Sequence, residues 1–165
     1  AYDIKKIIEE TPQTMFLTIT RKAAAQVNAW ALEALFAQDT PLAYLPIEDD
    51  TADNQDANAA PIINIPVYTG MRITLTKNLN KKIGFVNGMG ATVLGLSGRS
   101  LYAYTDQGQT IAVHPWTSEE HVVHYPFRLG YASTLHKVQG ATLKHITLWL
   151  DTAGCPAAAY VALLA

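Results

Sequence analysis

Residues 15–37 read MFLTITRKAAAQVNAWALEALFA, and an α/β fold follows from them. The first six residues are short, apolar and rich in β-branched side chains, which indicates a strand. The remainder consists of strong helix formers, with Val27, Trp30 and Leu35 at helical spacing. A strand followed directly by a helix is the opening unit of an α/β domain.

The segments on either side of this unit differ in character. Residues 2–10 place isoleucines on one face of a short helix, which Pro12 ends because the residue before a proline disfavours helical geometry. Residues 39–61 have no apolar period, and five of their acids fall between Glu48 and Asp56. This composition predicts an exposed loop.

A β-rich region occupies residues 80–128. Its short runs of strand-forming residues are 91–96, 100–105, 109–115 and 121–129. Asn87-Gly88 is a strong turn signal, since both residue types tolerate positive φ. Short strands at close spacing predict a small barrel or meander of four or five strands.

The α/β character returns after this region. Residues 130–139 predict a loop that leads into a short helix, and residues 144–150 alternate as a buried strand does. Residues 157–165, AAAYVALLA, predict a final helix. The expected organisation is therefore an α/β domain split by a small β insert.

The composition excludes several classes of protein. With 165 residues, 49% of them hydrophobic and 16% charged, the chain is long and apolar enough for one domain with its own core. The only cysteine is Cys155, which excludes an internal disulfide and a zinc cluster, and the histidines form no metal-ligand set. No apolar run approaches the length of a membrane span, so we expect no membrane partner and an intracellular location.

Charge is distributed unevenly along the chain. The net charge is −2, but residues 1–60 carry −6 and residues 61–165 carry +4. A basic half can mark a nucleic-acid partner. A solvated acidic loop beside an ordinary surface explains the same numbers, and the charge alone leaves both interpretations open.

One segment concentrates chemically useful groups. Residues 134–143, TLHKVQGATL, place an imidazole, an ammonium group and a carboxamide beside a glycine. The glycine permits close approach of a ligand, and the lysine could pair with a phosphate. A capped helix start with solvated polar side chains is the alternative. The chain has no G-x-x-x-x-G-K-[ST] segment that would hold a nucleotide phosphate.

Taken together and in order, these segments resemble the C-terminal part of a petite-integration-frequency-type DNA helicase, a RecD-like, 5′-to-3′ member of helicase superfamily one. That family has T-x-H-K-x-Q-G-x-T-L, which matches residues 134–143, and Y-V-A-L-S-R, which matches 160–163. The other counterparts are residues 15–32, 69–79 and 85–93. The resemblance covers about residues 14–165.

The resemblance implies a fold and a division into domains. Family members have two RecA-like domains that clasp single-stranded DNA, with ATP in the cleft between them. By resemblance this chain is the second RecA-like domain, with a mostly parallel sheet and an inserted small SH3-like β-barrel. Residues 1–79 would form its first part, 80–128 the insert, and 129–165 the remainder, truncated at its end.

The resemblance also implies binding residues and partners. The ATP cleft would include Thr20, Arg21, Gly140 and Thr142. Single-stranded DNA would contact Lys77, Asn78, Asn87, Gly88, Thr134, His136, Lys137 and Gln139, with Lys81 and Lys82 near the insert's hairpin. The first RecA-like domain, with its P-loop, would belong to the same parent protein, and the intact parent would bind ATP and Mg²⁺. We expect no catalytic or metal-binding residue and no bound cofactor in this chain alone.

The family's functions in DNA repair and recombination, and a location in the nucleus or mitochondrion of a eukaryote, are further expectations. One departure bears on activity: the family's Ser-Arg is replaced by Leu164 and Ala165. That arginine would stabilise charge on the γ-phosphate in the transition state. A degenerate binding module without ATPase activity therefore stays open as the alternative, and an unrelated α/β domain with an SH3-like insert is the third.

Overall fold

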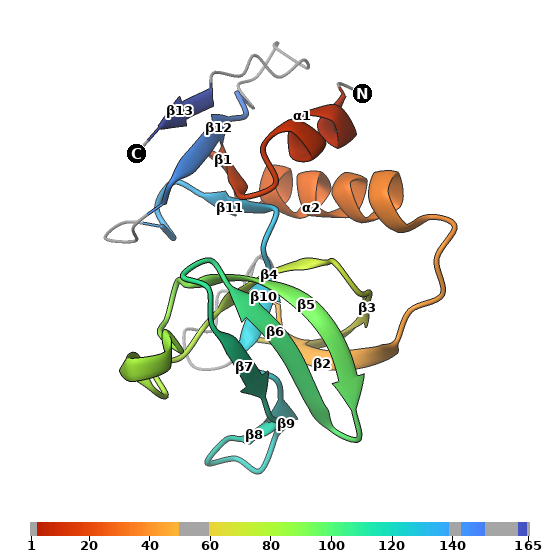
Figure 1. Cartoon of the computed structure of the whole chain (residues 1–165), viewed down its shortest axis with the longest axis vertical. Helices are drawn as coiled ribbons and strands as arrows, with labels where there is room; N and C mark the ends of the chain where they lie inside the picture. The colour runs from red at the N-terminus through yellow and green to blue at the C-terminus, as the bar shows by residue number, and fades with distance from the viewer. Residues whose placement is uncertain (1–2, 50–59, 139–142, 151–161, 165) are drawn as a thin grey trace. The chain divides into compact units, whose positions relative to one another are not determined.

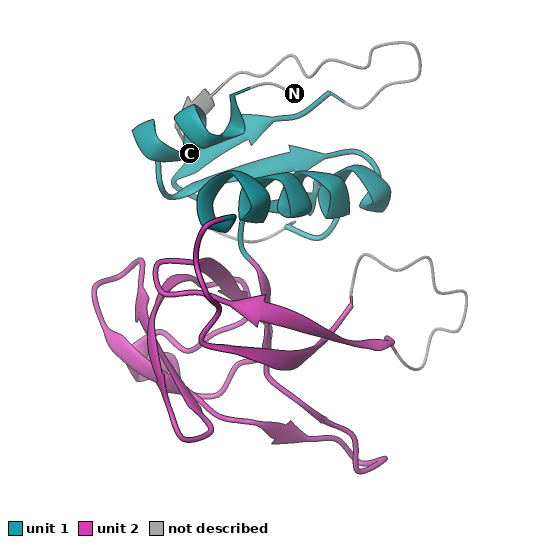
Figure 2. Cartoon of the chain, turned by 90° about the vertical axis from the view of Figure 1, so that its right-hand side faces the viewer, with its two compact units in different colours: residues 1–37, 130–165 teal, residues 38–129 magenta. Residues whose placement is uncertain are grey.

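The computed structural model describes residues 3–49, 60–138, 143–150 and 162–164. The chain divides into two compact units, coloured separately in Figure 2. Unit 1 comprises Ala1–Ala37 and Gly130–Ala165, and unit 2 is Gln38–Leu129. Unit 1 is therefore built from two stretches of sequence that are separated by unit 2.

Unit 1 is built on a four-stranded, mostly parallel sheet (Figure 1). β1 (Thr14–Thr18) lies between β11 (Ala132–Thr134) and β12 (His145–Leu148) and runs parallel to both. β13 (Ala162–Leu164) adds to β12 in the antiparallel direction. All five residues of β1 are buried, as expected for the central strand of a sheet covered on its faces.

Two helices accompany this sheet, α1 (Ile4–Glu10) and α2 (Arg21–Phe36). Asp3 caps α1 by accepting from the Lys6 amide at 3.2 Å, and Thr20 caps α2 by accepting from the Ala23 amide at 3.1 Å. Within the described parts of the chain, no helix is long and apolar enough to cross a membrane.

Aromatic packing joins α2 to the sheet. The ring of Trp149, just after β12, lies 6.1 Å from that of Phe16 and 5.8 Å from that of Trp30. Val27 and Ala31 of α2 are fully buried beside them in the core. The spacing of the apolar residues on this helix thus fixes which face meets the sheet.

The described residues of unit 2 form β-strands, turns and a short 3₁₀ helix, η1 (Lys81–Ile83). Its main sheet has the order β10-β4-β5-β6-β7, with every neighbouring pair antiparallel. These strands are β4 (Arg72–Leu75), β5 (Gly90–Ser97), β6 (Ser100–Thr105), β7 (Thr110–Val113) and β10 (Phe127–Leu129). Two ribbons complete the unit: β2 (Ala43–Glu48) with β3 (Ile62–Val67), and β8 (Trp116–Thr117) with β9 (Val123–His124).

The unit boundary differs from the expected one at its start. The insert was expected from residue 80, yet the compact unit begins at Gln38. The reason is that β4 pairs with both β5 and β10, and so draws the preceding residues into the same unit. Among the described strands the order of the main sheet is open, so the SH3-like barrel stays a prediction.

Three local expectations were wrong. Residues 39–61 were expected to be a loop, but they contain β2, whose Leu45 and Ile47 are buried opposite β3. Residues 130–138 form β11 and a turn rather than the start of a helix. Within the expected helix 157–165, residues 162–164 are strand β13, because pairing with β12 outweighs the helix propensity of alanine and leucine.

Candidate functional site

The carboxyl ends of two parallel strands meet at one edge of the unit 1 sheet. Thr18, the last residue of β1, is paired with Thr134, the last residue of β11. The Leu135 amide donates to the Thr18 carbonyl oxygen at 2.9 Å, which holds the segments after both strands side by side. We call the residues that follow these two strands, 19–21 and 135–138, the carboxyl edge. Ligands of open α/β sheets bind at such an edge.

The β1 side of the carboxyl edge contains Thr20 and Arg21. Thr20 is extended, with φ −102° and ψ 151°, and its hydroxyl caps α2. The Thr18 hydroxyl donates to the Thr20 carbonyl oxygen at 2.8 Å and fixes the bend between strand and helix. Arg21 is exposed at the first turn of the helix. A guanidinium group beside a helix N-terminus suits an anionic ligand such as a phosphate.

The β11 side contains Thr134, His136 and Lys137. The Lys137 amide points back to Thr134, 3.2 Å from its carbonyl oxygen and 3.2 Å from its hydroxyl oxygen. This turn leaves the side chains of His136 and Lys137 exposed. Both sides of the carboxyl edge therefore present exposed basic side chains. The remaining residues expected here, Gln139, Gly140 and Thr142, lie outside the described residues.

In unit 2, the structure brings Asn78 and Asn87 together. The Asn78 side-chain oxygen accepts from the Asn87 amide at 2.8 Å, and both residues are exposed. Gly88 has φ +95° and donates its amide to the Leu75 carbonyl oxygen at 2.8 Å. The hydrogen bond from Gly88 to Leu75 anchors the loop to β4. Of Asn87 and Gly88, only Gly88 has a positive φ, so the two residues do not form the predicted two-residue hairpin turn. We call residues 76–89 the β4–β5 loop.

The cations of this loop have different surroundings. The Lys77 ammonium lies 5.0 Å from the centre of the Trp116 ring, and that ring is 40% exposed. Lys81 and Lys82 lie in η1 and are exposed. Sequence reasoning missed Trp116, although an aromatic residue beside a basic loop is what a stacking site requires.

His124 is a second residue that sequence reasoning did not assign. It is 4% exposed, and its Nε2 lies 3.0 Å from a Glu48 carboxylate oxygen without the alignment of a hydrogen bond. Burial lowers the pKa of His124 below its ordinary 6.5, while Glu48 opposes this shift and Lys77 adds to it. The lowered pKa thus favours a neutral imidazole at neutral pH.

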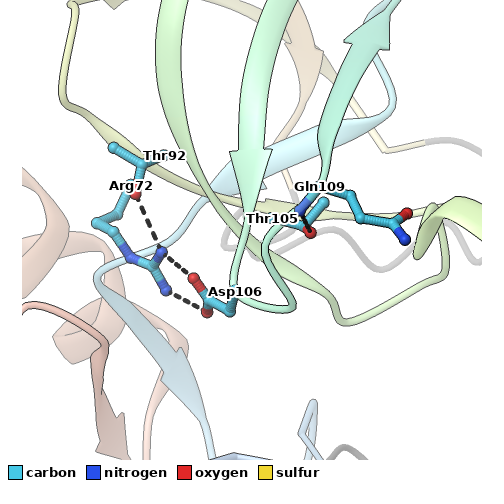
Figure 3. Close-up of polar contacts among 5 residues, drawn as sticks. All are labelled: Arg72, Thr92, Thr105, Asp106 and Gln109. Atoms are coloured by element: carbon cyan, nitrogen blue, oxygen red, sulfur yellow. Dashed lines mark hydrogen bonds and ion pairs between the residues drawn. The ribbon is translucent and has the colours of Figure 1, made fainter.

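A polar cluster supports the framework of unit 2 (Figure 3). Arg72 and Asp106 form a bidentate ion pair with N–O distances of 2.6 and 2.8 Å, and Arg72 also donates to the Thr92 hydroxyl at 3.3 Å. Gly90 permits this approach, because a Cβ there would collide with Asp106 Oδ2 and stand 2.7 Å from Arg72 Nη2. A side chain at Gly90, the first residue of β5, would therefore displace the ends of the Arg72 and Asp106 side chains.

In the part of the chain that the structure describes, no group of three or more His, Cys, Asp or Glu could hold a metal ion. The candidate residues, a separate group in each unit, offer cations, amides and one exposed aromatic ring. Such groups recognise phosphates and bases rather than metals.

No family model matches the chain, and no curated protein matches its sequence. Solved structures of Pif1 helicases do match its fold. A Bacteroides Pif1 bound to single-stranded DNA has a TM-score of 0.59 at 18% identity, over 88% of this chain and 36% of that one. A Bacteroides Pif1 with ADP-AlF3 and single-stranded DNA has a TM-score of 0.58 at 20% identity, over 94% and 37%.

The Pif1 helicase of Candida albicans gives a TM-score of 0.59 at 20% identity, over 86% of this chain and 39% of that one. The predicted resemblance to this type of helicase is confirmed in these structural neighbours. The parallel sheet of unit 1 fits a RecA-like fold. The chain spans little more than a third of the length of the solved helicases that it matches.

Proposed function

We propose that this chain supplies the second RecA-like motor domain of an ATP-dependent DNA helicase. In that role it binds single-stranded DNA and completes an ATP cleft with a P-loop domain of the same parent protein. Solved neighbours with this fold bind single-stranded DNA and ADP-AlF3. The ATP and Mg²⁺ belong to the intact enzyme, and unit 2 contributes an SH3-like insert.

The observation that carries this proposal is the carboxyl edge. Parallel pairing of β1 with β11 brings Thr20 and Arg21 beside the segment that contains His136 and Lys137. A nucleotide phosphate at the first turn of α2 and a nucleic-acid strand at the turn after β11 would then contact neighbouring backbone segments. That arrangement supports coupling between the two ligands, because a displacement of one backbone segment would displace the segment that is hydrogen-bonded beside it.

Each candidate residue has a chemical role in this proposal. Arg21 neutralises phosphate charge, and the Thr20 hydroxyl keeps α2 capped so that its N-terminus faces the nucleotide. His136, Lys137 and Gln139 contact the DNA strand, while Thr134 fixes their turn. Gly140 and Thr142 of the same motif would contact the nucleotide, as the resemblance implies.

The β4–β5 loop would also bind single-stranded DNA, through its cations and amides. Lys77, Lys81 and Lys82 attract the phosphates, and Asn78 with Gly88 holds Asn87 in position. Binding of this kind tracks the backbone and does not depend on sequence.

The test is direct binding by the full chain. We expect fluorescence anisotropy of a labelled oligothymidine to rise on addition of the protein, and a phosphate-release assay to detect no ATP turnover. A His136→Ala/Lys137→Ala variant should weaken binding. A variant of the exposed α1 lysines, Lys5→Ala/Lys6→Ala, is the control. Absence of binding, or robust hydrolysis by the pure chain, would contradict the proposal.

The alternative is a binding module without ATPase activity. It is favoured by Leu164 and Ala165, which stand where the family has Ser-Arg. The discriminating feature is the parent protein's P-loop. A parent with an intact P-loop domain that hydrolyses ATP when stimulated by DNA excludes the alternative, and a parent with a broken or missing P-loop supports it.

A further inference from the structure

Two exposed tyrosines lie on one face of the main sheet of unit 2. Tyr102 is 40% and Tyr104 is 48% exposed, while the intervening Ala103 is fully buried. They alternate with the core residues of β6, which lies between β5 and β7 in Figure 1. We call this pair the tyrosine platform. Neither tyrosine is among the residues discussed above as binding DNA or ATP.

The direct cross-strand partners of the tyrosine platform are small. Tyr104 is paired with Thr92 on one side and Thr110 on the other, and Tyr102 is paired with Gly95 and Ala112. Cross-strand partners share a face of a sheet. The register of β5 against β6 shifts between Val93 and Gly95, and the intervening Leu94 is 48% exposed. The exposure of both tyrosines leaves ring surface for a flat ligand.

The platform continues into the β4–β5 loop through the β6–β7 turn. The Tyr104 hydroxyl lies 3.4 Å from the position that a Cβ of Gly108 would take. In the same turn, the Gln107 side chain lies 3.5 Å from the corresponding Cβ position at Gly84, which directly follows η1. The β6–β7 turn thus lies next to both the residue that follows η1 and the hydroxyl of Tyr104.

The charge of this region favours an anionic occupant. Residues 61–118 carry five Lys or Arg and one acidic residue, Asp106. That single carboxylate is held by Arg72 in the bidentate pair. A polyanion therefore meets little repulsion along this segment. Exposed aromatic rings next to a basic loop are the pattern of single-strand binding surfaces.

We infer that the tyrosine platform is a base-stacking subsite for single-stranded nucleic acid, and that it extends the strand path from the β4–β5 loop across β6. This inference rests on the proposed function. Residues two apart in a strand are separated by about 6.8 Å, twice the rise of about 3.4 Å per nucleotide in a stacked helix. Each ring therefore takes one base of an extended strand.

The test compares binding of the full chain and a Tyr102→Leu/Tyr104→Leu variant to a labelled oligothymidine. Loss of base stacking on both rings should weaken binding by at least about tenfold, given the energy of base–aromatic stacking. Tyr44→Leu, which removes a 65% exposed tyrosine from β2, is the matched control and should bind as the unaltered chain does. Tyr102→Phe/Tyr104→Phe should also keep the affinity, because stacking needs the ring and not the hydroxyl.

An oligonucleotide with abasic sites separates stacking from backbone contacts. With it, the unaltered chain and the leucine variant should bind equally. If the leucine variant binds oligothymidine as well as the unaltered chain does, the inference is overturned. The proposed function then stands, and a protein partner becomes the explanation for the exposed tyrosines. If the unaltered chain does not bind at all, the proposed function fails and the inference fails with it.

Discussion

Asn28 on α2 and Ala132 on β11 exchange two hydrogen bonds across 104 positions of sequence. The side-chain Nδ2 of Asn28 donates to the backbone carbonyl oxygen of Ala132 at 3.1 Å, and the backbone amide of Ala132 donates to the side-chain Oδ1 of Asn28 at 2.9 Å. Both residues are buried. One carboxamide thus replaces a strand partner for β11 and ties the segment before His136 to the helix that begins at Arg21.

Replacing this carboxamide should destabilise the fold. Asn28→Ala leaves a buried amide and a buried carbonyl without partners, which should lower the free energy of unfolding by about 1–3 kcal/mol. Urea denaturation measures the loss. Gln26→Ala, at an exposed position of the same helix, should change it by less than about 0.5 kcal/mol. Equal losses in the two variants would show that the Asn28–Ala132 contacts contribute nothing specific.

The glycine beside the Arg72–Asp106 pair provides a second prediction. Gly90→Ala should cost about 1–3 kcal/mol of stability, because the added methyl group forces the ion pair apart. Gly95→Ala is the matched control, since no atom lies within 4 Å of its Cβ position. In an Asp106→Ala background the cost of Gly90→Ala should shrink. If the cost is unchanged in that background, the ion pair is not the reason for the glycine.

Stability should depend on the protonation of His124. Its pKa is lowered in the folded state, so the unfolded chain binds the proton more readily. This contribution is present above the ordinary pKa of 6.5 and is lost as the pH falls below it. Unfolding at about pH 7.5 and about pH 5.5 should therefore show a smaller acid-induced loss in His124→Gln than in the unaltered chain. An identical loss would mean that His124 does not titrate with unfolding.

The β4–β5 loop should make the affinity for DNA dependent on salt. Log affinity for a single strand falls with log salt concentration by roughly 0.7 per phosphate contact. Lys81→Ala/Lys82→Ala should therefore reduce the magnitude of the slope by about 1.4 if both lysines contact phosphates. Lys5→Ala/Lys6→Ala removes the same charge from α1 and should leave the slope as it is. Equal slopes for all three proteins would exclude phosphate contacts at Lys81 and Lys82.

The start of the fold could be predicted because its signals are local. Thr20 followed by an alanine-rich segment specifies a capped helix, and the apolar run before it specifies β1. The insert's short strands were equally visible from their turns. By contrast, β11 has three residues, and it is a strand only because it pairs with β1 and is held by Asn28.

Strands β2 and β13 could not be predicted from the sequence, for related reasons. Pro46 and the following acids hide the alternation of Leu45 and Ile47, which becomes meaningful only opposite β3. The alanines and leucines at residues 162–164 favour a helix in isolation, and pairing with β12 decides otherwise. Neither pairing can be derived from neighbouring residues.

His136 and Lys137 were chosen from their motif, and their role stays a prediction. That their segment follows a strand paired with β1 depends on the non-local pairing of Thr18 with Thr134, which no local pattern reveals. Trp116 and the tyrosine platform were missed because single aromatic residues in β-rich segments usually belong to a core. Only their exposure in the folded structure distinguishes them.

In the proposed function, DNA and nucleotide meet at one surface, the carboxyl edge. The most direct measurement is a titration of the isotope-labelled chain with oligothymidine, followed by backbone amide chemical shifts. We predict shifts of the Leu135, His136 and Lys137 amides, with smaller shifts at Thr20 and Arg21. Shifts confined to α1 and β2, with the carboxyl edge unchanged at saturating DNA, would contradict the account.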